Sequence, residues 1–351
     1  MPTTRHFLNW TRPALAATVD HLLRDLPSDA DEADLSRHRL ALLSGRASRR
    51  LLELLVATCE ARKLRLIPPK LMTVSHLAEH LHAPTAAIAT PLARRLLFAD
   101  AVRSIPTATL QAIAPTPPAE QDAAGWAALA QMVERLHNEL AAARLRFADV
   151  PPLADEALPD FADHDRFTAL AAIQDAYFEQ LDALNLEDPH RARLRALDAG
   201  TCSCDDPITL VAVNYLPPVV RAMLEQSGAD VTALVHAPAE RADAFDAFGC
   251  LDAAAWADAP IPLRDDQIEV VQRPADQAAA VLRGLQSLNG KYPADHITVG
   301  LCDESITPAL QQHLPAYDVP VRDAAGTPLS RTAESVGIST SSTPPAPQSP
   351  S

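Results

Sequence analysis

The stretch RLALLSGRASRRLLELL, residues 39–55, joins a short apolar run to a helical pattern. Residues 40–43 are apolar and have the length of a buried strand. After a short loop, apolar residues recur with the spacing of a helix, at Leu51, Leu52, Leu55, Val56 and Cys59. A strand that runs through a short loop into a helix is where nucleotide-binding α/β proteins keep their phosphate loop.

This loop lacks the residues of a Walker-type phosphate loop. That motif, G-x-x-x-x-G-K-[ST], needs glycines so that backbone N–H groups wrap the phosphates, a lysine for the β/γ-phosphates and a hydroxyl for Mg²⁺. Here the loop reads Ser44-Gly45-Arg46-Ala47-Ser48, with one glycine and no lysine. The residues alone are compatible with a phosphate loop that has lost its chemistry and with an ordinary strand-to-helix turn.

A second extended piece, RLIPPKLMTVSHL at residues 65–77, follows the helix. Pro68 and Pro69 keep it out of a helix, and Thr73 or Ser75 is expected to cap a helix that begins near His76. Strand, helix and strand in this order predict a βαβ unit and therefore a parallel sheet. We expect strands near 40–43, 64–68 and 208–213 to share that sheet, with ligands at the carboxyl ends of the strands, near residues 44–48.

Between residues 91 and 200 the pattern is helical. Amphipathic stretches cover 91–105, 125–150 and 165–188, with proline-rich joints at 115–118 and 151–159. One apolar stripe is expected to be core packing of a helical subdomain: Trp126, Leu129, Met132, Val133, Leu136 and Leu140.

The strand pattern returns after residue 200. Strands are predicted at 208–216, 230–237, 268–274 and 296–303, with helices at 217–227, 274–288 and 304–314. Asp303 and Glu304 are expected to cap the following helix rather than to bind Mg²⁺. The final stretch, ISTSSTPPAPQSPS, has no periodicity and is expected to be disordered.

Charge has to be considered locally in this chain. The 351 residues include 45 acidic and 30 basic ones, and a net charge of −15 argues against coating nucleic acid by bulk electrostatics while leaving room for a local basic groove. Between residues 37 and 70 there are nine basic residues and only two acidic ones, Glu53 and Glu60. This basic set is either a solvated helix face or a binding surface. The set is Arg37, Arg39, Arg46, Arg49, Arg50, Arg62, Lys63, Arg65 and Lys70.

Cysteine usage and hydropathy bear on disulfides, metal sites and cellular location. The five cysteines are scattered and do not suggest a disulfide framework, and Cys202-Ser203-Cys204 has no second pair with which to hold a metal. We therefore expect no metal and no cofactor. No segment approaches the ~20 apolar residues of a membrane span, so a cytoplasmic protein without membrane contact is expected.

The order of elements resembles the N-terminal, helicase-like part of the AddB/RexB family, the B subunit of bacterial ATP-dependent helicase–nuclease complexes that resect double-strand breaks. The matching segments are LALLSGRASRRLLELL, PPKLMTVSHLAEHL, the helices of 91–199 and the region from about 268 to 332. The last region is the most specific, because its strand, helix, strand with an Asp and helix lead into Val319-Pro320-Val321, then Asp323 and a Pro-Leu pair.

The resemblance implies an α/β fold: a RecA-like (P-loop-type) parallel-sheet domain with a large helical insertion, followed by the start of a second α/β domain. It assigns residues 1–35 to a lead-in, 36–90 and 200–262 to the first RecA-like domain, 91–199 to the insertion, 265–335 to the second domain and 336–351 to a disordered tail.

ATP-binding members of the family would carry Gly-Lys-Thr at the loop and an acidic pair after the later buried strand. This chain has Ser44 to Ser48 at the first place and VAVNYL, with Asn214, at the second. The family's PD-(D/E)XK nuclease domain and iron–sulfur cysteines have no counterpart here. The resemblance therefore implies a scaffold without ATPase or nuclease chemistry, with no catalytic residue, and a truncated or split gene product.

The expected function is that of a catalytically inactive helicase-like portion of an AddB-type DNA double-strand-break repair subunit, which contacts single-stranded DNA weakly, a helicase–nuclease partner subunit, or both. Arg46, Arg49 and Arg50 at the start of the first helix, with Lys70 and Thr73 after the second strand, are expected to face DNA phosphates. Arginine suits this role because its planar fork holds two phosphate oxygens and stays charged.

Two other classes of function remain open at this level. One is an α/β transferase or hydrolase that acts on a small molecule at the strand ends near Ser44 and Asn214, which predicts a closed pocket with convergent polar groups. The other is a structural interaction module whose helical insertion binds another protein.

Overall fold

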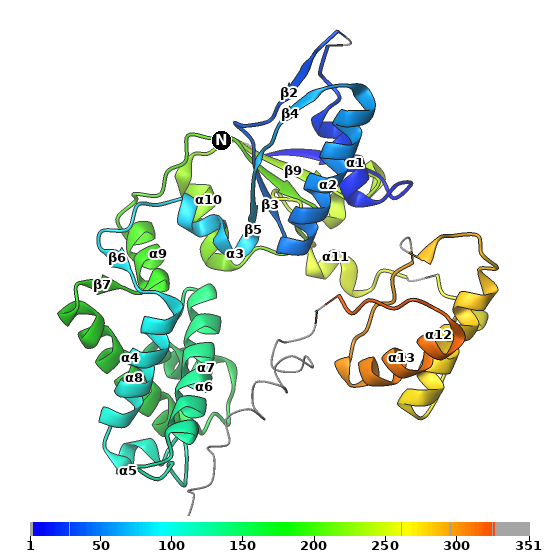
Figure 1. Cartoon of the computed structure of the whole chain (residues 1–351). Coiled ribbons are helices and arrows are strands. Elements are labelled where there is room, and N and C mark those ends of the chain that lie inside the picture. Colours follow the sequence, from blue (N-terminus) through cyan, green and yellow to red (C-terminus); the bar gives the residue numbers. More distant parts are fainter. Residues whose placement is uncertain (1–2, 28, 261, 295–296, 325, 327–351) are drawn as a thin grey trace, which may run out of the picture. The chain divides into compact units, whose positions relative to one another are not determined.

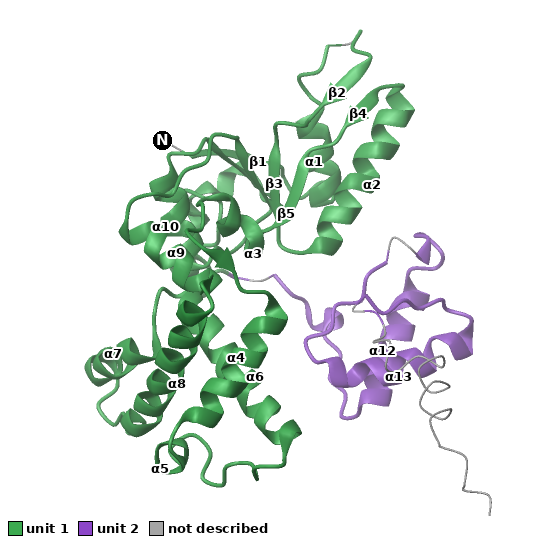
Figure 2. Cartoon of the chain, turned by 60° about the vertical axis from the view of Figure 1, so that its left-hand side comes forward, with its two compact units in different colours: residues 1–259 green, residues 260–351 purple. Residues whose placement is uncertain are grey.

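The computed structural model describes residues 3–27, 29–260, 262–294, 297–324 and 326. The tail expected at 336–351 lies outside this part of the chain. Internal contacts divide the chain into two units, Met1–Ala259 and Pro260–Ser351 (Figure 2). Each unit is described by itself.

Unit 1 is built on a parallel sheet of five strands (Figure 1). Their order across the sheet is β1-β9-β8-β3-β5. The strands are β1 (Thr4–Phe7), β3 (Arg39–Leu42), β5 (Lys70–Thr73), β8 (Ile208–Val211) and β9 (Val231–Val235). In register, β3 places Leu42 beside Thr73 of β5 and Ala41 beside Leu210 of β8. The expected α/β class with a parallel sheet is therefore observed, and strands near 40 and 208 are neighbours despite their separation in sequence.

One predicted strand of this sheet is wrong. Residues 65–67 form β4 (Arg65–Ile67), which pairs with β2 (Glu32–Asp34) in a separate two-stranded sheet, and the strand beside β3 begins only at Lys70. Pro68 and Pro69 lie between β4 and β5 and have no N–H to donate to a ladder, so the extended segment divides there. The expected N-terminal lead-in contributes the edge strand β1 and helix α1 (Ala14–Leu22).

Alternating side chains of the strands bury both faces of the sheet. On one face, Leu40 and Leu42 pack with α1 and with α2 (Gly45–Arg62). On the other face, Ala41, Met72 and Leu210 pack with three helices, α3 (Val74–Leu77), α9 (Pro189–Asp198) and α10 (Pro218–Ser227). Helices on both faces of a mostly parallel sheet are the ordinary α/β arrangement.

A block of helices connects β5 to β8 in the chain. It contains η1 (Ala78–His80), α4 (Pro91–Ser104), α5 (Thr107–Leu110), α6 (Ala123–Ala142), η2 (Phe147–Asp149), α7 (Val150–Ala157) and α8 (His164–Ala183). A pair of short parallel strands, β6 (Ala87–Ile88) and β7 (Leu186–Glu187), joins its beginning to its end.

The block has its own hydrophobic core. Phe98 of α4 stacks on Tyr177 of α8 with ring centroids 3.8 Å apart, and Phe147 is fully buried beside them. The stripe predicted on residues 126–140 packs against this core, which confirms its interpretation as core packing. Helix α6 ends at Ala142, earlier than expected, and Arg144 just beyond it adopts a left-handed conformation with φ 66°.

After β9, unit 1 closes with η3 (Ala239–Ala244) and α11 (Ala253–Ala257). Unit 2 contains η4 (Asp265–Gln267), α12 (Pro274–Ser287), η6 (Glu304–Ile306), α13 (Thr307–His313) and η7 (Pro315–Tyr317). Its small core is formed by Ala278, Ile306, Leu310 and Leu314.

The two strands predicted in unit 2 are wrong within the described residues. Residues 268–273 and 297–303 are irregular, α12 begins at Pro274, and Val270 is 90% exposed. A strand persists only when another strand satisfies its backbone groups, and the described part of unit 2 forms no such pairing. The expected capping role of Asp303 is confirmed, because its carboxylate accepts a hydrogen bond from Ser305 N at 2.9 Å.

Candidate nucleic-acid interface at the carboxyl edge of the sheet

Strands β3 and β8 lie side by side, but the helices that follow them cover opposite faces of the sheet. After β3 the chain turns into α2, and after β8 it turns into α10. Ala212 adopts a left-handed φ of 49° directly after β8. The two loops therefore diverge, which makes the β3/β8 boundary a topological switch point, the place where open α/β sheets bind their ligands.

The first loop is ordered by the N-terminus of α2. Ser44 caps the helix by accepting a hydrogen bond from Ala47 N at 3.2 Å, and Ser48 Oγ donates back to the Ser44 carbonyl at 3.2 Å. The first turn of this helix contains no acidic residue. Because the N-terminal end of a helix carries a partial positive charge and free N–H groups, this turn favours an anion.

Three of the predicted contact residues lie together on α2. Arg46, Arg49 and Arg50 are exposed and separated by three and four positions, so they share the helix face opposite the buried Ser48 and Leu51. Arg50 pairs with Glu53 at 3.0 Å, whereas within the described residues Arg46 and Arg49 make no ion pair with an acidic side chain.

Thr73 ends β5 at the same carboxyl edge, one strand beyond β3. Its Oγ1 lies 2.7 Å from Ser75 Oγ and 2.7 Å from His76 Nδ1. Thr73 occupies the predicted N-cap position, because α3 begins at Val74, but its side chain makes no capping hydrogen bond. The hydroxyls instead bond to one another and to the imidazole.

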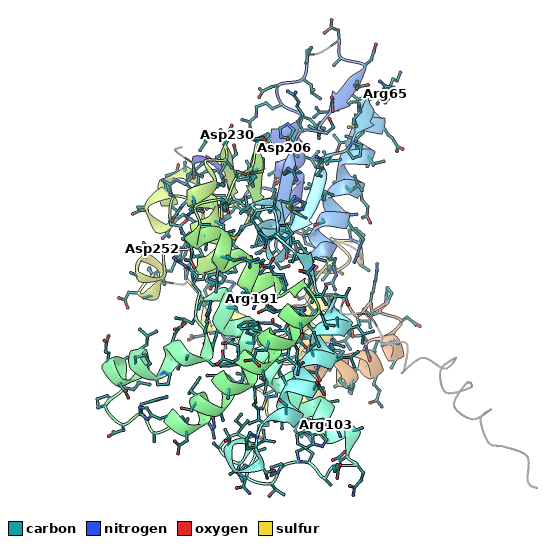
Figure 3. All side chains as sticks on the ribbon, turned by 90° about the vertical axis from the view of Figure 1, so that its left-hand side faces the viewer. Arg65, Arg103, Arg191, Asp206, Asp230 and Asp252 are labelled. Atoms are coloured by element: carbon teal, nitrogen blue, oxygen red, sulfur yellow. The ribbon has the colours of Figure 1, made fainter. Side chains whose placement is uncertain are left out.

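Lys70 does not belong to this edge. It begins β5 rather than following the strand as expected, and it lies beside Arg39 at the amino edge. There Lys70 Nζ lies 3.5 Å from Asp206 Oδ2, which also accepts a hydrogen bond from Arg39 Nε at 2.7 Å. That hydrogen bond and the charge of Arg39 hold the pKa of Asp206 below its ordinary value. Figure 3 shows Asp206 and Asp230, which precede β8 and β9, at this edge.

The carboxyl-edge loops of β3, β5 and β8 differ from the rest of the chain in having no acidic residue. Residues 40–52, 71–78 and 207–224, which include the carboxyl-edge loops of the three strands β3, β5 and β8, contain no Asp or Glu, although the chain has 45 of them. At the amino edge, in contrast, Asp205, Asp206 and Asp230 precede β8 and β9, and Arg39 and Lys70 pair with Asp206. The carboxyl edge therefore offers basic and neutral polar groups without a nearby carboxylate in these loops, which favours an anionic ligand.

Two hollows of unit 1 are lined by neither Ser44 nor Asn214, the loop residues of the switch point. One, of about 490 Å³, is on α2 and is lined by Arg49, Leu52, Glu53, Val56, Ala57 and Glu60. The other, of about 280 Å³, is in the helical block and is lined by Arg146, Asp182, Arg191, Arg195 and Asp198. Neither is lined by Ser44 or Asn214, so neither is the closed pocket that a small-molecule enzyme would need at those residues.

A buried polar cluster lies in the helical block, centred on Asp188. Its carboxylate accepts hydrogen bonds from Tyr177 Oη at 2.9 Å and from the backbone N–H of His190 at 2.8 Å and of Arg191 at 3.0 Å, which caps α9. Burial raises the pKa of Asp188, but the hydrogen bond and charge of the neighbouring His137 outweigh it and hold the pKa below its ordinary value.

His190 extends this cluster. Its Nδ1 lies 3.2 Å from Arg193 Nη1, and because a guanidinium only donates, Nδ1 must accept and Nε2–H must donate to Asn138 Oδ1 at 2.9 Å. Burial is the main cause that lowers the pKa of His190 to about 4. The hydrogen bonds of Asp188 and His190 join side chains of α6, α8 and α9, so the cluster serves to hold these helices together.

Comparison with known proteins does not assign the chain to a family. No family model matches the sequence, and no curated protein matches it significantly. Within the described residues, no group of three or more His, Cys, Asp or Glu side chains is placed to hold a metal ion. No helix in that part of the chain has the length and apolar character that crossing a membrane would require.

Proposed function

We propose that this chain is a helicase-like scaffold without ATPase chemistry, similar to the N-terminal part of AddB/RexB proteins, and that it binds single-stranded DNA at the carboxyl edge of its sheet during double-strand-break repair. In this proposal the sheet of unit 1 is a RecA-like domain and residues 91–199 are an insertion into it. The sequence resemblance and the neighbouring positions of β3 and β8 support both statements.

The observation that carries the proposal is the charge of the carboxyl edge. In an acidic chain, the loops of three neighbouring strands at one edge have no carboxylate, and the switch point between β3 and β8 has Arg46, Arg49 and Arg50 beside it on α2. A phosphodiester backbone is the anion that this arrangement suits, because guanidinium forks and helix N–H groups both bind phosphate oxygens.

Affinity is expected to be modest and steeply dependent on salt. The net charge of −15 opposes the long-range approach of a polyanion, so binding depends on a few local contacts. For single strands the slope of log K against log salt is about 0.7 per neutralised phosphate.

The test is fluorescence anisotropy with a labelled oligonucleotide at several salt concentrations. The triple variant R46A/R49A/R50A removes three possible phosphate contacts, so its slope should be flatter by about two units. The matched control is R37A/R65A/K70A, which changes the charge of the same basic segment by the same amount away from the carboxyl edge. It should leave the slope unchanged.

Two results would count against the proposal. If the wild type and both triple variants have the same slope, the arginines of α2 are only a solvated face. If no oligonucleotide binds at low salt, the chain is better explained as a protein-interaction module, and its partner should be sought by copurification.

A further inference from the structure

Two large aromatic side chains are exposed on the loops at the carboxyl edge. Trp10 follows the edge strand β1 and is 52% exposed, and Tyr215 follows β8 and is 62% exposed. Their positions could not be read from the sequence, because each depends on which strands become neighbours. Single exposed apolar residues are common on protein surfaces, but these two are distinguished by how they are held and by what lies beside them.

Trp10 is held in place by its surroundings. Asn9 N donates to the Ala237 carbonyl at 3.0 Å, which extends the β1–β9 pairing, and Asn9 then turns the chain with a φ of 63°. Asn9 Oδ1 accepts a hydrogen bond from Trp10 N at 2.6 Å, and the indole Nε1 donates to the His236 carbonyl at 2.7 Å. A side chain fixed through its N–H while half of its surface stays exposed is preorganised to stack.

Tyr215 lies in the second loop of the switch point. The backbone of this loop is fixed on both sides, because the Asn214 carbonyl accepts a hydrogen bond from Leu251 N at 3.0 Å and α10 begins at Pro218. The loop holds no acidic residue, and the strand beside it, β3, leads directly to Arg46.

The strand order places these residues in a row. β1 and β8 are separated by β9 alone, so the two aromatic loops are about two strand spacings apart, ~10 Å. That distance corresponds to about three nucleotides at the ~3.4 Å rise of a stacked strand. One further spacing leads to β3 and the N-terminus of α2.

We propose that Trp10 and Tyr215 are base-stacking positions of a track for unpaired nucleic acid that runs across the carboxyl edge from β1 to α2. This inference rests on the proposed function and adds a second kind of contact to it. Aromatic side chains bind single strands because every base has an exposed π-face, whereas the bases of a duplex are already stacked. The ligand class is therefore a single strand, and a duplex of the same length should bind less tightly.

The two ends of the track differ in chemistry. Glu240 and Asp243 are exposed in η3, which follows β9 next to the strand of Trp10, and they oppose a phosphate there. The Trp10 end must therefore contribute by stacking, while the α2 end contributes by charge. It follows that replacing an aromatic residue should change affinity without changing the salt slope.

The experiment compares an oligothymidine with an abasic oligomer of the same length, which has the same phosphates and no bases. The full chain should bind the oligothymidine more tightly than the abasic oligomer. Stacking is worth about tenfold or more in affinity per base, so W10A and Y215A should each weaken oligothymidine binding by about tenfold. Both variants should leave the abasic affinity and the salt slope unchanged.

Controls separate stacking from loss of structure. W10F keeps an aromatic face but loses the N–H that fixes the ring, so it should bind more tightly than W10A and less tightly than the wild type. Y317A removes an equally exposed tyrosine, 62%, from unit 2 and should have no effect. Equal binding of the two oligomers, with a salt slope that still depends on Arg46, Arg49 and Arg50, would overturn the stacking track and leave the phosphate interface standing. Failure of both oligomers to bind would overturn the proposed function and the track together. Binding of duplex as tight as that of the single strand would also refute the track.

Discussion

At the scale of single residues, His190 shows how neighbours fix a protonation state. A donor-only guanidinium faces its Nδ1, the imidazole is largely buried, and its Nε2–H already has an acceptor in Asn138. A second proton would have to be placed opposite Arg193, so the folded protein retains the neutral ring. The negative charge of Asp188 raises the pKa of His190, but burial lowers it by more.

Stability should therefore depend on pH through His190. Its pKa falls from an ordinary 6.5 to about 4 on folding, so between these values the unfolded chain binds the proton and stability is lost as the pH falls. From pH 7.5 to pH 5 this group alone should cost about 2 kcal/mol of the free energy of unfolding. Urea denaturation at both pH values should show that loss in the wild type and a smaller one in H190Q.

The comparison between variants isolates His190 from other groups. His21 and His80 also have pKa values lowered chiefly by burial, and they titrate equally in both proteins. Asp188 contributes below its ordinary range of about pH 4, outside the measured interval. An equal loss of stability in the wild type and H190Q would show that His190 becomes protonated without cost in the folded state.

The sequence predicts which residues share a helix face, because that depends on a local repeat. It does not predict at which edge of the sheet a residue lies, because that depends on the register between strands. Arg46, Arg49 and Arg50 share a face because the helix repeats every 3.6 residues, which the sequence itself encodes. Lys70 was misplaced because the register of β5 against β3, not the sequence near Lys70, decides at which edge it lies. Asp188 was missed because its partners come from helices far apart in the chain, although an Asp before a Pro is a typical start of a helix.

At the scale of elements, the same distinction applies. The strand, loop and helix of residues 39–62 follow from apolar periodicity, so the sequence predicts them closely, although the Ser44 cap that starts the helix is not among the predictions. Residues 268–273 and 297–303 have strand-like composition, but β-propensity is expressed only when a neighbouring strand accepts the pairing. The double proline at 68–69 is recognisable in the sequence as a helix breaker, while its effect on sheet membership depends on the pairing of β4 with β2, which no local pattern reveals.

The protein should not hydrolyse ATP, because the loops at the switch point lack the groups that this reaction needs. The loop before α2 has Arg46 but no lysine, and the loop after β8 has Asn214 where a carboxylate would hold Mg²⁺. No acidic side chain is present in residues 40–52 or 207–224 to replace it. Phosphate release from Mg-ATP, measured with and without single-stranded DNA, should equal that of a mock preparation. DNA-stimulated release above this background that is lost in R46A would contradict the assignment of this loop.

At the scale of the whole molecule, acidic residues are distributed unevenly along the chain, and the two units have separate cores. The excess of acidic residues is excluded from three loops at one edge of the sheet, and all residues of the proposed interface belong to unit 1. Unit 2 has a separate small core formed by α12, η6 and α13. The segment between the units, residues 258–264, contains no helix or strand among its described residues and includes Pro260 and Arg264.

Limited proteolysis with trypsin should therefore cut first after Arg264. A protease needs an exposed, extended segment, and helices with buried faces must unfold locally before they can be cleaved. Arg264 is exposed in irregular backbone, and its ion pair with Asp266 is a surface pair of little strength. Mass spectrometry should identify a resistant fragment of residues 1–264, and R264Q, which removes the cleavage site, should abolish that fragment. A first cut after Arg144, in the turn of the helical block, would show that the block opens more readily than this segment. Because Trp10, Tyr215 and the arginines of α2 all lie within the fragment, the purified fragment should bind oligothymidine with the affinity and the salt slope of the full chain.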